Sequence, residues 1–592
     1  MTVTTFSDDA RAALRETFGF DDFRGRQAAV VERVLAGRST LAIMPTGAGK
    51  SLTYQLPAAM LDGTCVVVSP LIALMHDQLR SARANGLAAA TLTSVDEDWR
   101  ETIAALKRGE LDLLYVAPER ASQPGFRDLL GDVPLALFAI DEAHCVSEWG
   151  HDFRPDYRRL LPLLDAFPSV PRLALTATAD RRTRDDVLAQ LGIPADGLVL
   201  AGFDRPNIRY EIDARASPVR QLASLMNERP GPGIVYVPTR RKTEELAARL
   251  GKETGRPVRA YHAGLPKEAR ADNQAAFVAS EDMVMVATVA FGMGIDKPDV
   301  RFVAHVGIPK SIEAYYQETG RAGRDGDPAV AVMLWAAGDF ATARGRITEV
   351  EPARQAGERE RLDALAGLVE TPGCRRAVLL RHFGEDPPER CGNCDNCLAP
   401  PRTEDATELA RKLLSAVYRT GQSFGFGHVA KVLTGNGDER VRQRGHDRLS
   451  VFGIVDESEA ARLKAVAQAL QVRGALEATA HGGLAFGPAA PAILKGELPV
   501  ALIEPPRRRR PGRGGGEANP VGNPLFEALR AMRKSLAEEA GVPPYVVFHD
   551  STLREITLAR PASPADLATI PGIGKRKREA YGDAVLQTVR NH

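Results

Sequence analysis

The sequence predicts an α/β protein with two parallel sheets, followed by a cysteine-rich module and further small domains. Three observations support this. Apolar runs alternate with helix-prone stretches of roughly ten to twenty residues over about the first 340 positions. After about position 344 the sequence becomes highly charged, and four cysteines then cluster between Cys374 and Cys397. The length of 592 residues fits roughly four domains.

Each predicted strand is apolar throughout, as expected where helices cover both faces of a parallel sheet. The first five runs are Leu41–Met44, Thr64–Pro70, Leu111–Pro118, Leu135–His144 and Leu173–Thr178. Three more follow at Gly233–Thr239, Met283–Thr288 and Phe302–Gly307. The series pauses around positions 203–207 and then restarts, which predicts two separate sheets.

Composition and charge exclude several classes of protein. Charged residues make up 26% and hydrophobic residues 44% of the chain, as in ordinary soluble domains, so a mostly disordered chain is excluded. No apolar run approaches the eighteen or so residues that span a bilayer, and the start MTVTTFSDDA has no signal-peptide pattern. We therefore expect a cytoplasmic protein with no membrane partner. The 77 basic against 76 acidic residues, taken alone, argue against nucleic acid as a ligand.

The segment MPTGAGKS, at positions 44–51, lies between a predicted strand and a helix-prone stretch. Such a turn lets backbone N–H groups approach phosphates, with the positive end of a helix behind them. Met44 occupies a position where the full pattern has glycine, but the core TGAGKS is intact. Lys50 is expected to reach the outer phosphates and the Ser51 hydroxyl to bind Mg²⁺. The predicted nucleotide-binding residues of this loop are Thr46, Gly47, Gly49, Lys50 and Ser51.

Two carboxylates end the run LALFAI, where the carboxyl edge of a sheet can meet a metal-bound phosphate. We expect Asp141 to hold Mg²⁺ and Glu142 to orient or deprotonate the attacking water. A lone acidic pair at a strand end is commonly just solvated. Its place after a phosphate loop favours the catalytic interpretation.

The order of TGAGKS, DEAH, LTATA and QETGRAGRDG resembles that of superfamily 2 helicases. Further segments, FGFDDFRGRQ, CVSEWGHDFRPDY, FDRPNI, ATVAFGMGIDKPDVR and CRRAVLLRHFG with CGNCDNC, are similar to bacterial RecQ DNA helicases. The resemblance covers essentially the whole chain. It implies RecA-like lobes at 1–205 and 206–343, a zinc-binding subdomain at 344–402, a winged-helix (RQC) domain at 403–503, and an HRDC domain at 523–592. The Arg-, Gly- and Pro-rich stretch 504–522 cannot form a core, so we expect a flexible linker there.

The resemblance also assigns residues around the nucleotide. Phe20 and Arg24 would stack on adenine, and Gln27 would hydrogen-bond its edge, which favours ATP over GTP. In the second lobe, the predicted phosphate-facing residues are Gln317, Arg321 and Arg324. A guanidinium brought across the cleft can accelerate phosphoryl transfer by about 10³- to 10⁵-fold. Which of the two arginines does so stays open at this point.

An aromatic and cationic string follows the acidic pair. Aromatic rings stack on unpaired bases, and arginine adds phosphate contacts; the residues concerned are Trp149, His151, Phe153 and Arg154. DNA bound there would signal to Glu142 through His144 and Ser147. The segments SPLIALMHDQ, APER and ATVAFGMGID would contact the DNA backbone, which carries no sequence information.

The C-terminal modules offer weaker signals for DNA contact. In the winged-helix domain, GHDRLSVFGI resembles the duplex-facing helix of the family, with His446 and Arg448 as candidates. In the HRDC domain, the turn IPGIGKRKREAYG presents Lys575 and Arg576. Ordinary surface exposure explains these side chains nearly as well.

The clustered cysteines form a C-x16-C-x2-C-x2-C arrangement of Cys374, Cys391, Cys394 and Cys397. Four thiolates suit a closed, structural Zn²⁺ site. An iron–sulfur cluster is the rival, because its ligands are also four cysteines. The resemblance favours zinc.

The expected function is that of an ATP- and Mg²⁺-dependent 3′-to-5′ helicase that translocates on single-stranded DNA and unwinds tailed or branched duplexes in recombination and repair. We expect a monomer in the bacterial cytoplasm, nucleoid-associated during repair, with a single-stranded-DNA-binding protein as a candidate partner. An RNA helicase and an ATP-gated DNA clamp or annealing protein are the alternatives. Local cationic strips such as positions 507–510 and 575–578 remove the objection from net charge, because the field within about 10 Å of a groove is what draws DNA. They predict strongly salt-sensitive binding.

Overall fold

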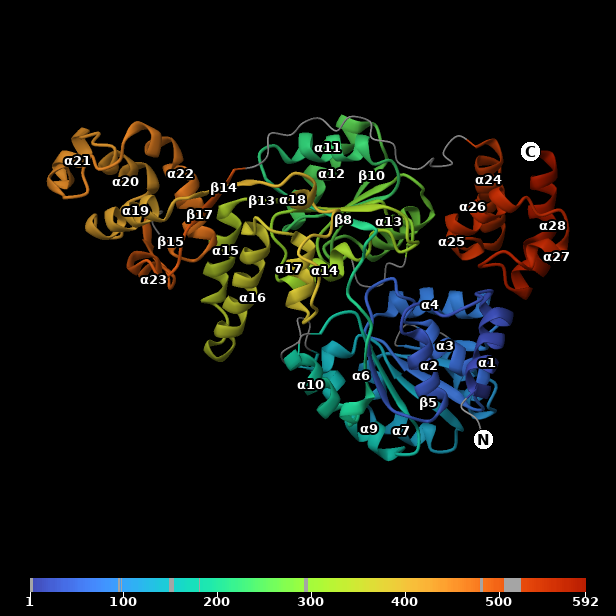
Figure 1. The fold of residues 1–592 in the computed structure, drawn as a ribbon. Coiled ribbons are helices and arrows are strands. Elements are labelled where there is room, and N and C mark those ends of the chain that lie inside the picture. The colour runs from blue at the N-terminus through green and yellow to red at the C-terminus, as the bar shows by residue number, and fades with distance from the viewer. Residues whose placement is uncertain are drawn as a thin grey trace.

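The protein has two parallel-sheet lobes, with smaller modules attached at opposite ends of the second lobe (Figure 1). This computed structural model describes residues 4–93, 96, 98–147, 154–179, 181–291, 297–479, 483–504 and 523–592. Within these ranges, no helix is both long and apolar enough to cross a membrane.

Lobe 1 is a sheet of seven strands in the order β3-β4-β2-β5-β6-β1-β7, with every neighbouring pair parallel. Its strands are β1 (Thr40–Ile43), β2 (Thr64–Val68), β3 (Ala89–Leu92), β4 (Leu113–Val116), β5 (Leu135–Ile140), β6 (Arg172–Thr176) and β7 (Leu198–Leu200). The longer helices are α1 (Thr4–Ala13), α2 (Gln27–Leu35), α3 (Leu52–Met60), α4 (Ile72–Ala84), α5 (Trp99–Lys107) and α10 (Arg181–Gln190). Short helical pieces complete the lobe: η1 (Leu14–Phe18), α6 (Pro118–Ala121), α7 (Pro124–Leu130), η2 (Ala143–Val146), α8 (Pro155–Arg158), α9 (Leu161–Ala166) and η3 (Ala195–Gly197).

Lobe 2 is a sheet of six strands in the order β10-β11-β9-β12-β13-β8, again parallel throughout. Its strands are β8 (Ile208–Ala214), β9 (Gly233–Tyr236), β10 (Val258–Tyr261), β11 (Val284–Ala287), β12 (Phe302–Val306) and β13 (Ala329–Trp335). The helices are α11 (Pro218–Glu228), α12 (Arg240–Thr254), α13 (Lys267–Ala279) and α14 (Ile312–Thr319). The predicted class of two parallel sheets is confirmed.

The segment that joins the lobes, residues 201–207, is packed in a core that it shares with the cysteine module. The ring of Phe203 stacks on that of Phe383, with centroids 4.6 Å apart, and Tyr316 of lobe 2 lies 4.9 Å from the same ring. Arg376 of the cysteine module pairs with Asp204 at 3.0 Å. Side chains of lobe 2 and of the cysteine module therefore hold the connecting segment in place.

The modules after lobe 2 are mainly helical. α15 (Ala337–Ile347), α16 (Pro352–Glu370), α17 (Arg375–His382) and α18 (Asp395–Leu398) form the cysteine module. The next domain contains α19 (Thr407–Arg419), α20 (Phe426–Leu433), α21 (Glu439–Gln443), η4 (His446–Arg448), α22 (Glu457–Val472) and α23 (Ala490–Lys495). Its strands form two antiparallel pairs, β14 (Arg402–Asp405) with β17 (Ala501–Glu504) and β15 (Leu476–Ala478) with β16 (Leu484–Phe486). The expectation of a helix over GHDRLSVFGI is wrong, because the segment forms only the short 3₁₀ turn η4 followed by turns, and Gly445 and Gly453 adopt left-handed backbone.

The C-terminal domain has its own apolar core and docks on both lobes. It consists of α24 (Pro524–Ala540), α25 (Pro544–Val547), α26 (Asp550–Ala559), α27 (Pro564–Leu567) and α28 (Lys575–Asn591). Three arginines of this domain form ion pairs with acidic residues of lobe 2. Arg554 pairs with Asp327, and both Arg530 and Arg533 pair with Glu281. On the lobe 1 side, the N–H of Gly572 donates to the carbonyl of Gly19 at 2.8 Å, and Arg576 donates to that of Arg83 at 2.9 Å. Sequence alone left this docking undecided. The predicted linker, apart from Glu504, lies outside the described residues.

Candidate active site and metal centre

The phosphate loop lies between the end of β1 and the start of α3. Gly47 and Gly49 have φ values of +84° and +71°, a region that side chains rarely adopt, so glycine is required there. The Nζ of Lys50 lies 3.3 Å from the carbonyl oxygen of Met44. Glycines in this conformation let backbone N–H groups turn toward a phosphate, while the contact of the loop and of Lys50 with phosphate stays a prediction.

The predicted adenine element packs directly against this loop. Gln27 is 3% exposed, and its Nε2 donates to the carbonyls of Ala48 at 2.9 Å and Gly49 at 3.2 Å. The guanidinium of Arg24 lies 5.6 Å from the centroid of Phe20. These three predicted residues are therefore gathered beside the loop, while their contact with adenine stays a prediction.

The two carboxylates follow β5 as predicted. Asp141 is buried; burial and the neighbouring charge of Glu142 raise its pKa to about 7, although Lys50 opposes the shift. Glu142 has φ +50°, a strained conformation for a side-chain-bearing residue of the kind found at functional sites. Carboxylate and hydroxyl oxygens are the donors that a hard cation such as Mg²⁺ prefers, and the role of Asp141 and Ser51 as its ligands stays a prediction.

His144 links the acidic pair to the neighbouring strand. Its Nδ1 lies 3.3 Å from Oε2 of Glu142 and 2.9 Å from Oγ1 of Thr176, which belongs to the LTATA motif. Ser147, three residues after His144, is fully buried. The guanidinium of Arg154 donates a hydrogen bond to the carbonyl of Pro70 at 3.1 Å. Trp149, His151 and Phe153 lie outside the described residues, as do positions 292–296 of the ATVAFGMGID segment.

The two motif arginines of lobe 2 have different surroundings. Arg321 is 6% exposed and interacts with Tyr236 inside lobe 2. Arg324 lies across the cleft, because a methyl group added to Gly47 would be 3.2 Å from its Cγ. Gln317 lies on α14, four residues before Arg321, and is half-buried. Of the two arginines, Arg324 is thus the one placed against the phosphate loop.

Arg205, to which the sequence analysis gave no role, joins the two lobes at the same place. Its Nη1 donates to the carbonyl of Thr46 at 2.5 Å and to that of Gly320 at 3.2 Å. Its Nη2 donates to the carbonyls of Ala322 and Gly323, both at 2.9 Å. The segment FDRPNI resembles that of the family, but no local pattern in it predicts these distant partners.

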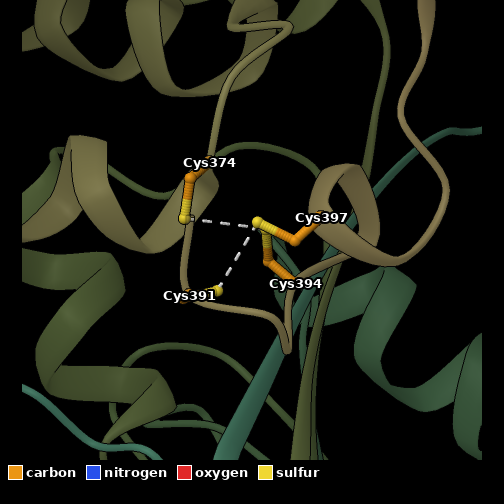
Figure 2. Close-up of side chains that lie close together, drawn as sticks. All are labelled: Cys374, Cys391, Cys394 and Cys397. Carbon is orange, nitrogen blue, oxygen red and sulfur yellow. Dashed lines mark hydrogen bonds between the residues drawn. The ribbon is translucent and has the colours of Figure 1, made fainter. Parts of the chain in front are cut away.

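The four clustered cysteines converge on one point (Figure 2). Their sulfur atoms all lie within 4.8 Å of one another, and the Sγ atoms of Cys391 and Cys397, and of Cys374 and Cys394, are 3.9 Å apart. Four thiolates at about 2.3 Å from one tetrahedral Zn²⁺ would be about 3.8 Å apart, so the observed spacing fits a single ion. A multi-iron cluster would hold its thiolates farther apart, which favours zinc over the rival.

The comparisons with known proteins agree with this geometry. Family models match in the order DEAD/DEAH box helicase (24–187), helicase conserved C-terminal domain (217–326), RecQ zinc-binding (337–398), RQC domain (400–511) and HRDC domain (523–589). The "ATP-dependent DNA helicase RecQ" of Haemophilus influenzae is 40% identical over 98% of this chain and 96% of its own length. The protein of the same name from Bacillus subtilis is 37% identical over 98% of both chains.

The chain belongs to the RecQ family. Its resemblance to RecQ helicases, its fold and its four-cysteine zinc centre are thereby confirmed. The mouse "Bifunctional 3'-5' exonuclease/ATP-dependent helicase WRN" is 36% identical over 78% of this chain, and this chain covers 35% of it.

The predicted DNA contacts of the two C-terminal RecQ modules have different surroundings. In the winged-helix domain, His446 is half-buried with its Nδ1 2.8 Å from Nε2 of His428, while Arg448 is exposed. In the HRDC domain, Lys575 is exposed and Arg576 is held against lobe 1. Their contact with DNA stays a prediction.

Proposed function

We propose that this protein is an ATP- and Mg²⁺-dependent DNA helicase that translocates 3′ to 5′ on single-stranded DNA and unwinds tailed or branched duplexes. The observation that carries the proposal is the placement of Arg324 of lobe 2 over Gly47 in the phosphate loop of lobe 1. A guanidinium at that point acts on ATP only while the lobes are closed. Hydrolysis and opening of the lobes are then one coupled event.

The chain's own residues divide the chemistry. Backbone N–H groups of the phosphate loop and Lys50 hold the phosphates, while Glu142 accepts a proton from the attacking water. Mg²⁺, held by Asp141 and Ser51, would neutralise charge on the phosphates. Arg324 stabilises the charge that develops on the transferring group, and Gln317 and Arg321 support it from α14 and the loop that follows.

DNA acts on this centre through His144. Because its imidazole contacts both Glu142 and Thr176, a movement of the neighbouring loop alters the position of the water-activating carboxylate. The loop residues Trp149, His151 and Phe153 are the proposed stacking platform. Phosphate contacts spread over both lobes and the winged-helix and HRDC domains make the affinity strongly dependent on salt.

Further properties follow from this function. The zinc centre acts as scaffold for the joint between the lobes rather than in chemistry. We also propose that the protein is a monomer in the bacterial cytoplasm and that it associates with the nucleoid during recombination and repair. Its proposed protein partner is a single-stranded-DNA-binding protein.

The test is strand separation on a 3′-tailed duplex by wild type and by Lys50→Ala. Lys252→Ala is the matched control, since Lys252 is an exposed lysine of α12. We expect unwinding by wild type and K252A only, no unwinding of a 5′-tailed duplex, and ATP hydrolysis stimulated by single-stranded DNA more than by RNA. Equal unwinding by K50A and wild type would show that the motor site is wrongly assigned.

A further inference from the structure

Arg205 stands in the connection between the lobes, and its backbone has little freedom. The N–H of Phe203 donates to Oε1 of Glu385 at 2.5 Å, and the hydroxyl of Tyr316 donates to the carbonyl of Phe203 at 2.6 Å. On the other side, Nδ2 of Asn207 donates to the carbonyls of Gly323 at 2.8 Å and Asp327 at 2.9 Å. The side chain of Arg205 therefore extends from an anchored position.

Its acceptors lie on the two loops that face each other across the nucleotide cleft. Thr46 belongs to the phosphate loop, and a methyl group on the adjacent Gly47 would lie 3.4 Å from Nη1 of Arg205. The acceptors at 320, 322 and 323 flank Arg321 and directly precede Arg324. A planar guanidinium holds its N–H donors in a fixed geometry. These hydrogen bonds therefore both connect the two loops and set the distance between them.

We infer that Arg205 is a positioning residue for ATP hydrolysis, which joins the phosphate loop to the arginine-bearing loop so that Arg324 meets the transferring phosphate. Arg205 does not touch the reacting atoms. It acts by setting where Arg324 lies when the lobes are closed. The inference rests on the proposed ATPase function of this cleft.

The chain supplies a matched control in Arg256. Its guanidinium also binds four backbone carbonyls, those of Met226, Arg229, Gly231 and Asp282. All four belong to lobe 2. Arg256→Ala therefore removes a comparable set of bonds without unlinking the lobes, which separates a role in stability from a role in positioning.

The experiment measures DNA-stimulated ATP hydrolysis by wild type, R205A, R205K and R256A. Because misplacement of a catalytic group by about 1 Å can cost about 100-fold, we expect R205A to lower kcat by about that factor while KM for ATP changes by less than about threefold. A lysine has one compact donor group and cannot bridge the two loops, so we expect R205K to lose at least about tenfold. R256A should keep kcat within about threefold of wild type, whatever its loss in thermal stability.

A second measurement requires no hydrolysis. Fluorescent labels at the exposed positions Lys107 of lobe 1 and Lys252 of lobe 2 report the distance between the lobes. We expect a longer or broader distance in the Arg205 variants and an unchanged one in R256A.

The inference would be overturned if the kcat of R205A were less than about tenfold below the kcat of R256A. If R205A does not fold, the kcat of R205K is compared with that of R256A in the same way. A wild-type protein without DNA-stimulated ATPase activity would instead contradict the proposed function. In that case the distance between the labels on the two lobes still tests whether Arg205 joins the two loops. An unchanged distance in the Arg205 variants would show that it does not.

Discussion

The HRDC domain is held on lobe 2 largely by charge, so reversing one charge should release it. Both Nη atoms of Arg554 reach Asp327, and the two side chains are 27% and 21% exposed. In Arg554→Glu, two carboxylates would face each other across the interface. Asp327 would keep Arg301 as a partner at 3.5 Å, so lobe 2 itself should stay intact.

The magnitude follows from the partial burial of the pair. A hydrogen-bonded charge pair is worth about 1.5–3 kcal/mol when water is excluded, and partial exposure reduces this to about 1–2 kcal/mol. Repulsion between the two carboxylates at about 4 Å adds close to 1 kcal/mol even at the dielectric constant of water. The docked state should therefore lose about 2–3 kcal/mol, which is about 30- to 150-fold in the docking equilibrium.

The assay is a salt titration of fluorescence energy transfer between labels on lobe 2 and α24, at the exposed Lys252 and Lys534. R554E should undock at a lower salt concentration than wild type, because salt screens the ion pairs of Glu281 that remain. Arg560→Glu, the same charge change at an exposed position after α26, is the control. An undocking midpoint for R554E equal to that of R560E would refute the reasoning.

Three further variants test the remaining assignments. Cys394→Ser should lower the bound zinc, measured by elemental analysis, and reduce thermal stability, whereas Cys65→Ala should retain one zinc per chain; a coloured protein containing iron would contradict the zinc assignment. Glu142→Gln should reduce ATP hydrolysis by about 10²- to 10⁴-fold with ATP binding preserved, and a smaller loss would mean that another group activates the water. Gln27→Ala should raise KM for ATP and narrow the preference for ATP over GTP, measured by steady-state hydrolysis, and an unchanged preference would remove Gln27 from adenine recognition.

The predicted strands are buried central strands of the two sheets, and the edge strands were not predicted. The apolar runs predicted for both lobes contain strands in the structure, because central strands of a parallel sheet are covered on both faces. The four edge strands that were not predicted are β3, β7, β8 and β10. In β8, Ile208, Tyr210 and Ile212 are buried and the residues between them are half-exposed, and β7 and β10 are only partly buried. These three strands therefore lack a continuous apolar signal. The strands β3 and β13 are buried and were also not predicted.

The parts of the site within a single short segment were predictable in the same way. The phosphate loop needs glycines at fixed spacing, the carboxylates follow a buried strand, and three of the zinc ligands lie within seven residues of one another. Each such motif makes its geometry locally, through backbone conformation or ligand spacing. The 3₁₀ turn at η4 shows the limit, because the resemblance suggested a helix where Gly445 and Gly453 turn the chain instead.

The sequence by itself determined the two-sheet class, the phosphate loop, the acidic pair and the four-cysteine centre of this RecQ-family chain. Only the tertiary structure decided which motif arginine lies over the phosphate loop, that Arg205 joins the two lobes, and that the HRDC domain docks on both. The physical reason is separation along the chain. The guanidinium of Arg205 meets carbonyls 159 and 115 residues away, and no local periodicity or spacing encodes the packing that brings them together.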